Sequence, residues 1–377
     1  MEMVIKQNNA YSFTETLLQE IGITINGSEA WDIKVHHRDF FNRVLKEGSL
    51  GLGESYMAGW WDCENLDQFI YRIIKAHFAS RLKSNKRILL KGLLYRLINM
   101  QNRARSLIVG RQHYDLGVSL FQAMLDRSLN YSCGYWLNAS DLDQAQQNKM
   151  ALVCRKLMLK PGMRLLDIGC GFGSLAKYAA MHHGVKVVGI TISHQQAEYA
   201  QSHCGDLPIE IRFQDYRDIS ESFDRVVSIG MFEHVGALNY SHYFKKIHSI
   251  LPEEGIFLLH TIGRNVSTFR ADEWISKYIF PNGMLPSITQ IGKAIENLFV
   301  MEDWHNFGAD YDRTLMAWYN NFQMNWDQLK SSYDHRFYRM WRYYLLACAG
   351  VFRARDIQLW QVVLSKNGIL HGYHAPR

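Results

Sequence analysis

The chain has 377 residues, of which 47% are hydrophobic and 21% charged, and its net charge is +6 at pH 7. This length suits two domains, or one α/β domain with large additions, and the composition is that of a globular protein with ample core. Aromatic residues make up 13% of the chain. Most are expected in the core, and the remainder indicate a site or surface for apolar ligands.

The cysteines and the hydropathy exclude two further classes of protein. The six cysteines are scattered without a C-x-x-C pair, so no zinc or other metal site is expected. No apolar run approaches the ~18 residues of a membrane span, and residues 1–7 do not resemble a signal peptide. We therefore expect a cytoplasmic protein with reduced thiols.

The sequence of residues 1–70 predicts small helices and turns. The segment 68–114, which begins at the end of this region, is basic. This segment has no Asp or Glu, and apolar residues at helical spacing separate its cations. The cations are Arg72, Lys75, Arg81, Lys83, Lys86, Arg87, Lys91, Arg96, Arg103, Arg105 and Arg111. Such a stretch favours docking on anionic lipid. Nucleic acid is a rival partner, and a helix that packs its apolar stripe on its own protein is the structural alternative.

Seven segments from residue 164 onward predict strands, with helical patterns between most of them. They are 164–168, 185–190, 209–213, 225–229, 256–261, 299–304 and 359–364. This alternation predicts an α/β fold with a doubly wound, mostly parallel sheet. Ligands bind such sheets at the carboxyl ends of the strands, so the residues just after those ends are the candidate site.

A glycine loop follows the first of these strands. It reads Asp167-Ile168-Gly169-Cys170-Gly171-Phe172-Gly173, and a helical pattern begins at once. Glycine allows a sharp turn and a close approach of the backbone to a ligand, and the N–H groups at the helix start face that ligand. With a second strand at βαβ spacing, the loop predicts a site for a nucleotide-type cofactor.

The loop differs from the dinucleotide fingerprint G-x-G-x-x-G, because its third glycine comes one place early and no acid ends the second strand. Asp-x-Gly-x-Gly-x-Gly instead resembles motif I of the class I S-adenosylmethionine (SAM) methyltransferases, in which this loop passes under the amino-acid part of SAM. Most of that superfamily has an acidic ribose ligand after the second strand. Here Thr191, Ser193 and Gln196 are the polar side chains available to replace it.

Two titratable side chains fall at strand ends beside this predicted cofactor site. Glu233 follows the fourth strand and His260 ends the fifth. They are candidates for acid–base groups or for holding a ligand, with structural hydrogen bonding as the alternative. Cys133 lies among polar and aromatic residues, and its spacing alone favours a buried, inert thiol.

Several stretches over nearly the whole chain resemble the cyclopropane-fatty-acyl-phospholipid synthases. They are residues 48–56, 113–117, 131–133, 230–236, 259–263, 304–311 and 352–360, together with the glycine loop, where Phe172 replaces a frequent tryptophan. In that family, SAM methylates a cis double bond in an acyl chain of a membrane phospholipid. The resulting carbocation loses a proton and closes as a cyclopropane ring. The resemblance implies a Rossmann-like, seven-stranded class I methyltransferase fold with a helical insertion and a smaller, mainly helical N-terminal domain.

The resemblance also implies that the base is a bound bicarbonate. The family's binding pattern falls on Cys133, Glu233, His260, the backbone of Ile262, and Tyr311, each of the matching residue type. A small base held by several hydrogen bonds in a closed apolar site suits a carbocation that must be shielded from water. Glu233, as an anion, would accept a hydrogen bond from the bicarbonate O–H, while His260 and Tyr311 can donate.

The resemblance carries over a set of cofactor contacts and one further cysteine. The contacts are Tyr131, Ser132, Asp167, Gly169, Cys170, Gly171, Phe172, Gly173, Thr191, Ile192, Ser193, Gln196, Gln214, Asp215 and Tyr216. Cys348 has been treated in the family as a possible nucleophile, but the helical apolar run around it, 343–351, favours a structural role. The helical segment 311–352 separates the last two strands and is interpreted as an apolar lid or acyl tunnel.

The resemblance divides the chain into residues 1–105, a lipid-binding and dimer-forming domain with a basic linker, and residues 106–377, the catalytic domain. It favours a membrane surface over nucleic acid as the partner of the basic stretch. The implied partners are an anionic phospholipid surface, an unsaturated phospholipid substrate and a second copy of the chain in a homodimer. The predicted location is the cytoplasm, peripherally on the inner face of the cell membrane.

Overall fold

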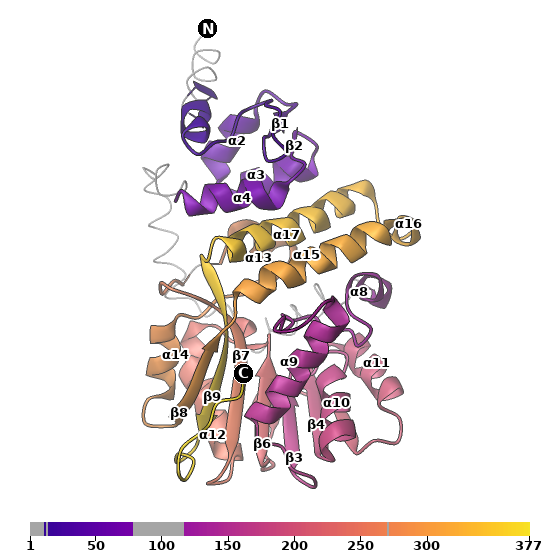
Figure 1. Ribbon diagram of the computed structural model, residues 1–377, viewed down its shortest axis with the longest axis vertical. Coiled ribbons are helices and arrows are strands. Elements are labelled where there is room, and N and C mark those ends of the chain that lie inside the picture. Colours follow the sequence, from indigo (N-terminus) through magenta and orange to yellow (C-terminus); the bar gives the residue numbers. More distant parts are fainter. Residues whose placement is uncertain (1–10, 13, 78–116, 270) are drawn as a thin grey trace.

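The computed structural model describes residues 11–12, 14–77, 117–269 and 271–377, and a seven-stranded sheet lies at its centre (Figure 1). Its strands are β3 (Arg164–Ile168), β4 (Lys186–Thr191), β5 (Ile209–Phe213), β6 (Arg225–Ile229), β7 (Ile256–Arg264), β8 (Val300–Asn306) and β9 (Ile357–Ser365). Their order is β5-β4-β3-β6-β7-β9-β8. Strand β9 runs antiparallel to both neighbours, and the other pairs are parallel. The predicted α/β fold with a mostly parallel sheet is confirmed.

The first, third and fourth strands have the predicted bounds, and the largest differences involve β7 and β9. Strand β7 continues to Arg264 because β9 pairs with it along its whole length. His260 and Ile262 therefore lie two residues apart inside a strand, and the expectation that His260 stands at the end of this strand is wrong. Strand β9 pairs with both residues and β6 pairs with His260, so neighbouring strands fix the backbone that carries them.

Helices cover both faces of the sheet. Helices α9 (Leu142–Lys156) and α10 (Ser174–His183) pack on one face of the sheet. Helices α12 (Tyr240–Ile250) and α14 (Ile288–Ile295) pack on the other. Successive strand residues point to opposite faces, so Leu165 joins the first core and Leu166 the second. Helix α11 (His194–Cys204) follows β4 and packs on β4 and β5.

A layer of helices lies beyond one end of the sheet, between it and the N-terminal region (Figure 1). It contains α8 (Val118–Met124), α13 (Glu273–Tyr278), α15 (Ala309–Met324), α16 (Trp326–Leu329) and α17 (His335–Arg353). Helices α15 and α17 pack against each other as a hairpin between β8 and β9. The long helical segment predicted before the last strand is confirmed.

The described N-terminal residues form small helices and turns, as predicted. They are α2 (Phe40–Glu47), α3 (Ser49–Met57) and α4 (Leu66–Lys75), with the two-residue strands β1 (Lys34–Val35) and β2 (Trp61–Asp62). Their buried side chains share one apolar core with α8, α15 and α17. A Cβ at Gly350 of α17 would lie 2.5 Å from the carbonyl oxygen of Asp67. Glycine therefore allows α17 to lie directly against α4.

Charged contacts reinforce this packing between α17 and the N-terminal region. Arg339 donates to the carbonyl oxygens of Tyr56 and Trp61, and Arg353 forms ion pairs with Asp67 and Asp312. The basic stretch beyond residue 77 and the expected boundary at residue 105 lie outside the described residues, so both stay predictions. Among the described helices, none is long and apolar enough to cross a membrane.

Candidate active site

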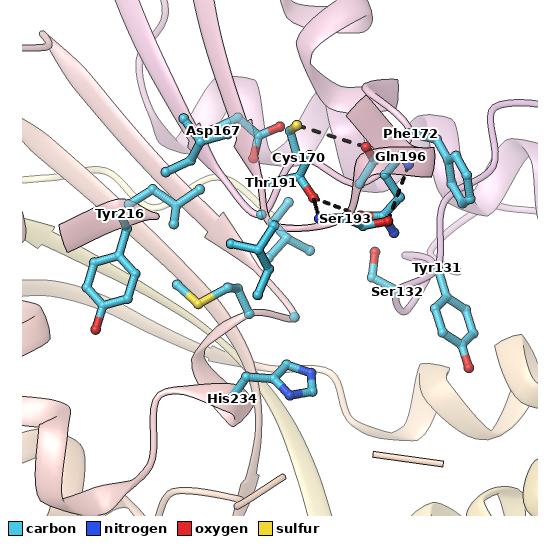
Figure 2. Close-up of a pocket in the computed structure, with 18 of the residues that line it drawn as sticks. Tyr131, Ser132, Asp167, Cys170, Phe172, Thr191, Ser193, Gln196, Tyr216 and His234 are labelled. Atoms are coloured by element: carbon cyan, nitrogen blue, oxygen red, sulfur yellow. Dashed lines mark hydrogen bonds between the residues drawn. The ribbon is translucent and has the colours of Figure 1, made fainter. Parts of the chain in front are cut away.

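A cavity opens at the carboxyl ends of β3, β4, β5 and β6, where the sequence predicted ligand binding (Figure 2). Every predicted cofactor residue lines it except Gly173, whose backbone instead caps the start of α10. Residues 129–132 form another wall, and the hydroxyl of Tyr131 lies 2.9 Å from that of Tyr344 in α17. The helical layer therefore helps to fix one wall of the cavity.

The glycine loop supplies a backbone surface to this cavity. Gly169, Gly171 and Gly173 have φ values of 80°, 56° and 82°, which side chains disfavour. A Cβ at Gly169 would lie 3.0 Å from the Cβ of Met231, whereas a Cβ at Gly171 would meet no heavy atom within 4 Å. Gly171 thus leaves open space in the cavity wall, which fits the close approach of a cofactor.

The residues after β4 are held in place by hydrogen bonds among themselves. Ser193 caps α11 by accepting from the N–H of Gln196 at 3.3 Å, and Thr191 donates to the Gln196 side chain at 3.0 Å. No acid stands at the end of β4, as the sequence indicated. These neutral side chains fit a polar ligand without adding charge.

The residues after β5 form a short 3₁₀ turn, Tyr216–Asp218. Arg217 donates to both oxygens of Asp215, each at 2.8 Å. The carboxylate of Asp215 is therefore already paired with a cation. The ring of Tyr216 packs edge-to-face on Tyr243 with centroids 5.2 Å apart, which fixes it at the cavity wall (Figure 2).

A second group of predicted residues forms a buried cluster beside the cavity. We call it the base pocket and define it by Cys133, Glu233, His260, Ile262 and Tyr311. Glu233 lies in the 3₁₀ turn Phe232–His234 after β6, and its Oε1 accepts from the backbone N–H of Ile262 at 2.7 Å. The N–H expected to face bicarbonate is therefore engaged by Glu233 in this structure.

One further polar atom of Glu233 and one of His260 lack a partner among the described residues. Oε2 of Glu233 and Nε2 of His260 are both buried and make no hydrogen bond within the described part of the chain. Nδ1 of His260 lies 3.3 Å from the side-chain nitrogen of Gln361. When this amide nitrogen donates to Nδ1, the imidazole proton lies on Nε2. A neutral His260 would then donate into the base pocket.

Burial governs the charges of these two groups. It raises the pKa of Glu233 to about 7, against the hydrogen bond from Ile262, which lowers it. It also lowers the pKa of His260 well below its usual value, helped by the positive charges of Lys149 and Lys156. His260 is therefore neutral at pH 7, while Glu233 titrates near that pH.

The helical layer completes the base pocket. Cys133, Ile262 and Tyr311 pack in one apolar cluster with Phe307, and the ring of His260 lies 5.8 Å from that of Phe307. Thr314 of α15 accepts from the N–H of Gly134 at 3.1 Å, which ties the Cys133 segment to the same helix as Tyr311. Burial raises the pKa of both the Cys133 thiol and the Tyr311 hydroxyl, so both stay protonated at pH 7 and can donate.

Cys348 lies on α17 and packs in the core beneath the N-terminal region, which also contacts Ile262 and Tyr311 of the base pocket. Burial raises the pKa of its thiol to about 12. A thiol in this state is a poor nucleophile at pH 7, because the thiolate is the reactive form. The structural interpretation of this residue stays a prediction.

Known proteins match the chain over its full length. Residues 101–362 match the family model described as mycolic acid cyclopropane synthetase. The chain belongs to this family. It is 54% identical to the cyclopropane-fatty-acyl-phospholipid synthase of Escherichia coli (strain K12), covering 100% of this chain and 98% of that protein.

Solved members of the family share the fold. The cyclopropane synthase MmaA2 from Mycobacterium tuberculosis superposes with a TM-score of 0.66 at 30% identity, covering 71% of this chain and 100% of that one. The mycolic acid cyclopropane synthase CmaA1, solved with S-adenosylhomocysteine (SAH) and CTAB, gives 0.65 at 33% identity, covering 69% and 98%. The family membership makes this chain a SAM-dependent enzyme with a class I methyltransferase fold.

Sequence reasoning missed six polar residues that line the cavity. They are Asn130, Lys149, Ser174, Arg217, His234 and Asn282. Nδ1 of His234 is buried and makes no hydrogen bond within the described residues, and burial lowers its pKa to about 4, so its ring is neutral. Lys149 lies in the middle of α9, where a cation among helix residues predicts solvent exposure. Only its packing against residues 130–132 reveals that it faces the cavity.

Proposed function

We propose that this enzyme transfers a methylene group from SAM to the cis double bond of an unsaturated phospholipid acyl chain and forms a cyclopropane ring. The observation that carries this proposal is the base pocket. Glu233 Oε2 and His260 Nε2 are two buried polar atoms that make no hydrogen bond within the part of the chain that the structure describes, and they lie beside the apolar cluster of Cys133, Ile262 and Tyr311. Leaving such atoms unpaired is costly, so their presence supports a small polar ligand between them.

Bicarbonate fits this donor set. His260 and Tyr311 can donate to its oxygens, and Glu233 can accept from its O–H. The backbone N–H of Ile262 donates to Glu233 at 2.7 Å and thereby orients that carboxylate. When bound, bicarbonate would supply the general base that removes a proton from the methylated chain. We infer that Cys133, Glu233, His260, Ile262 and Tyr311 hold it.

The cavity fits SAM, which would supply the methyl group. The open space at Gly171 and the neutral side chains of Thr191, Ser193 and Gln196 support this placement. The loop after β6 belongs to both sites, because Met231 lines the cavity while Glu233 lies in the base pocket. The methyl donor and the base would then lie on either side of one short turn.

The aromatic and aliphatic lining of the base pocket would shield a carbocation from water. Tyr135, Phe307 and Leu359 are each less than one-tenth exposed and pack with Cys133. Excluding water prevents capture of the cation as an alcohol. We infer that helices α15 and α17, which cover this region, serve as an apolar lid over the acyl chain.

The reaction is tested by incubating the pure protein with SAM and vesicles of a cis-monounsaturated phospholipid. We expect an acyl product heavier by one methylene group that resists mild hydrogenation, as a ring does. A methyl-branched alkene or a hydroxylated chain would show that the cation is resolved in another way. No methylene-extended product would reject the proposed function.

We further propose that the enzyme acts as a homodimer on the cytoplasmic face of the cell membrane, through the basic stretch 68–114. The lack of acidic residues in that stretch supports an anionic surface as the partner. Binding to vesicles should weaken with added salt and with neutral lipid. Equal binding to neutral and anionic vesicles would contradict this role, and analytical ultracentrifugation would test the dimer.

A further inference from the structure

Lys149 is a buried cation on the wall of the cofactor cavity. Its side chain is 1% exposed, and its Nζ donates to the side-chain oxygens of Asn130 at 2.8 Å and Ser132 at 2.9 Å. One turn earlier on α9, Gln146 donates to the carbonyl oxygen of Ser132 at 2.8 Å. This face of α9 therefore fixes the segment that forms one wall of the cavity.

The ammonium group keeps one bonding direction for a ligand. It carries three hydrogens, and the two contacts with Asn130 and Ser132 use two of them within the described part of the chain. Burial lowers the pKa of Lys149 to about 8, against the negative charges of Asp126 and Asp167, which raise it. Lys149 is thus mainly protonated at pH 7.

The position of this charge within the cavity is specific. Among the described lining residues, the other permanent cation is Arg217, and it is paired with both oxygens of Asp215 at the β5 end. Lys149 instead lies near Asp167, whose negative charge raises its pKa, and both line the cavity together with the glycine loop. Asp126 is occupied by the backbone and side-chain N–H groups of Asn130, at 2.8 and 3.0 Å.

This region of the cavity would receive the amino-acid part of SAM, which carries one carboxylate and an ammonium group. We propose that Lys149 binds the α-carboxylate of SAM, with Asn130 and Ser132 holding its ammonium in place. Asp167 is buried near this cation, and burial raises its pKa to about 7, against the positive charge of Lys149, which lowers it. A bound α-ammonium would favour the negatively charged form of Asp167 further. The inference rests on the proposed cofactor site and not on the lipid substrate.

The test compares two ligands that differ only in the carboxylate. Isothermal titration calorimetry is done with SAH and with S-adenosyl-3-thiopropylamine, which lacks the α-carboxylate. A hydrogen-bonded charge pair predicts that the wild type binds SAH about 10- to 100-fold more tightly. Lys149→Met should remove most of this preference, because it should lower the affinity for SAH and change the affinity for the analogue by less than about threefold.

Lys156 provides the matched control. It lies on the same helix, its side chain is fully buried, and its Nζ is 3.0 Å from Asp303, away from the lining of the cavity. Lys156→Met should leave the preference for SAH unchanged. Lys149→Gln removes the charge but keeps a donor for Asn130 or Ser132, and it serves as the second variant if Lys149→Met does not fold.

Two results would overturn the proposal. The first is equal binding of SAH and the analogue by the wild type, which needs no variant. The second is an equal loss of affinity for both ligands in a folded Lys149 variant, because this would mean that Lys149 only supports residues 130–132. Binding is measured without lipid, so the absence of a cyclopropane product would reject the proposed function and leave this inference standing.

Discussion

The cofactor cavity and the base pocket meet at the turn after β6 but satisfy their polar groups differently. In the cavity, Thr191, Ser193 and Gln196 lie beside the glycine backbone and are hydrogen-bonded to one another. In the base pocket, Glu233 and His260 each keep a buried atom that makes no hydrogen bond within the described part of the chain. The wall after β4 is already organised for binding, whereas the base pocket leaves capacity for a ligand that completes it.

The two regions also differ in the elements that build them. The cavity is made mainly from loops that directly follow parallel strands. The strand and glycine patterns that predict the cavity therefore lie next to its residues in the sequence. The base pocket joins β7 to helix α15 and to the Cys133 segment, through Phe307 and Thr314. Substitutions in the two regions should therefore affect different steps, and the following experiments test that separation.

The largest effect is expected from Glu233→Gln, which removes the acceptor for the base. General acid–base function is worth about 10²- to 10⁴-fold, so kcat should fall by at least about 10²-fold. The Kd for SAH should change by less than about threefold, because the Glu233 side chain lies outside the cavity lining. Product mass spectrometry and calorimetry measure the two. Unchanged turnover would show that the assignment of the base pocket is wrong.

Gly171→Ala should break the cavity instead. The new Cβ would project into the open space at Gly171, so it should lower the affinity for SAH by about 10- to 100-fold. The positive φ of 56° adds a folding cost of about 1–2 kcal/mol.

Gly59→Ala is the matched control for Gly171→Ala, since Gly59 has a φ of 72° and no neighbour within 4 Å but lies far from the cavity. Calorimetry should detect weakened binding in Gly171→Ala only, while both variants unfold at lower denaturant concentration. Equal SAH affinity in the two variants would mean that the cofactor does not approach the backbone at Gly171.

The pH profile should separate the two regions without a mutation. The pKa of Glu233 is raised to about 7, so its carboxylate is protonated progressively below that pH. If the anion is needed, kcat/KM should fall about tenfold per pH unit below 7, while SAH binding changes less.

The raised pKa of Glu233 also means that the folded state keeps a proton that the unfolded state loses, so the contribution of Glu233 to stability decreases as pH rises from about 4.5 to 7. Urea titrations of Glu233→Gln should lack that decrease.

The smallest effects on kcat are expected from substitution of cysteines. The effect should be larger at Cys133, in the base pocket, than at Cys348, on α17. Cys133→Ser replaces a donor in the base pocket and should lower kcat by about tenfold, as expected for one altered hydrogen bond. Cys348→Ser should change kcat by less than about twofold, because its thiol is protonated at pH 7. A large loss with Cys348→Ser at unchanged stability would restore a chemical role for that residue.

Local patterns in the sequence determined the strands, the glycine loop and the fold class. Alternating apolar strands and helices act over a few residues, and glycine at Gly169, Gly171 and Gly173 has a local conformational cause. Glu233 and His260 were found because strand ends are the expected place for ligands. Their assignment to bicarbonate came from the family resemblance, and no spacing in the sequence shows which of their atoms lack partners.

Tertiary packing decided the rest. It brings Tyr311 on α15 beside Cys133, engages the N–H of Ile262 with Glu233, and buries Lys149 against residues 130–132. These contacts join segments that are distant in sequence, and the cost of burying their polar groups depends on neighbours that no local pattern specifies. The sequence by itself therefore determined the site of methyl transfer within the sheet, while the folded core determined which polar groups remain free to act there.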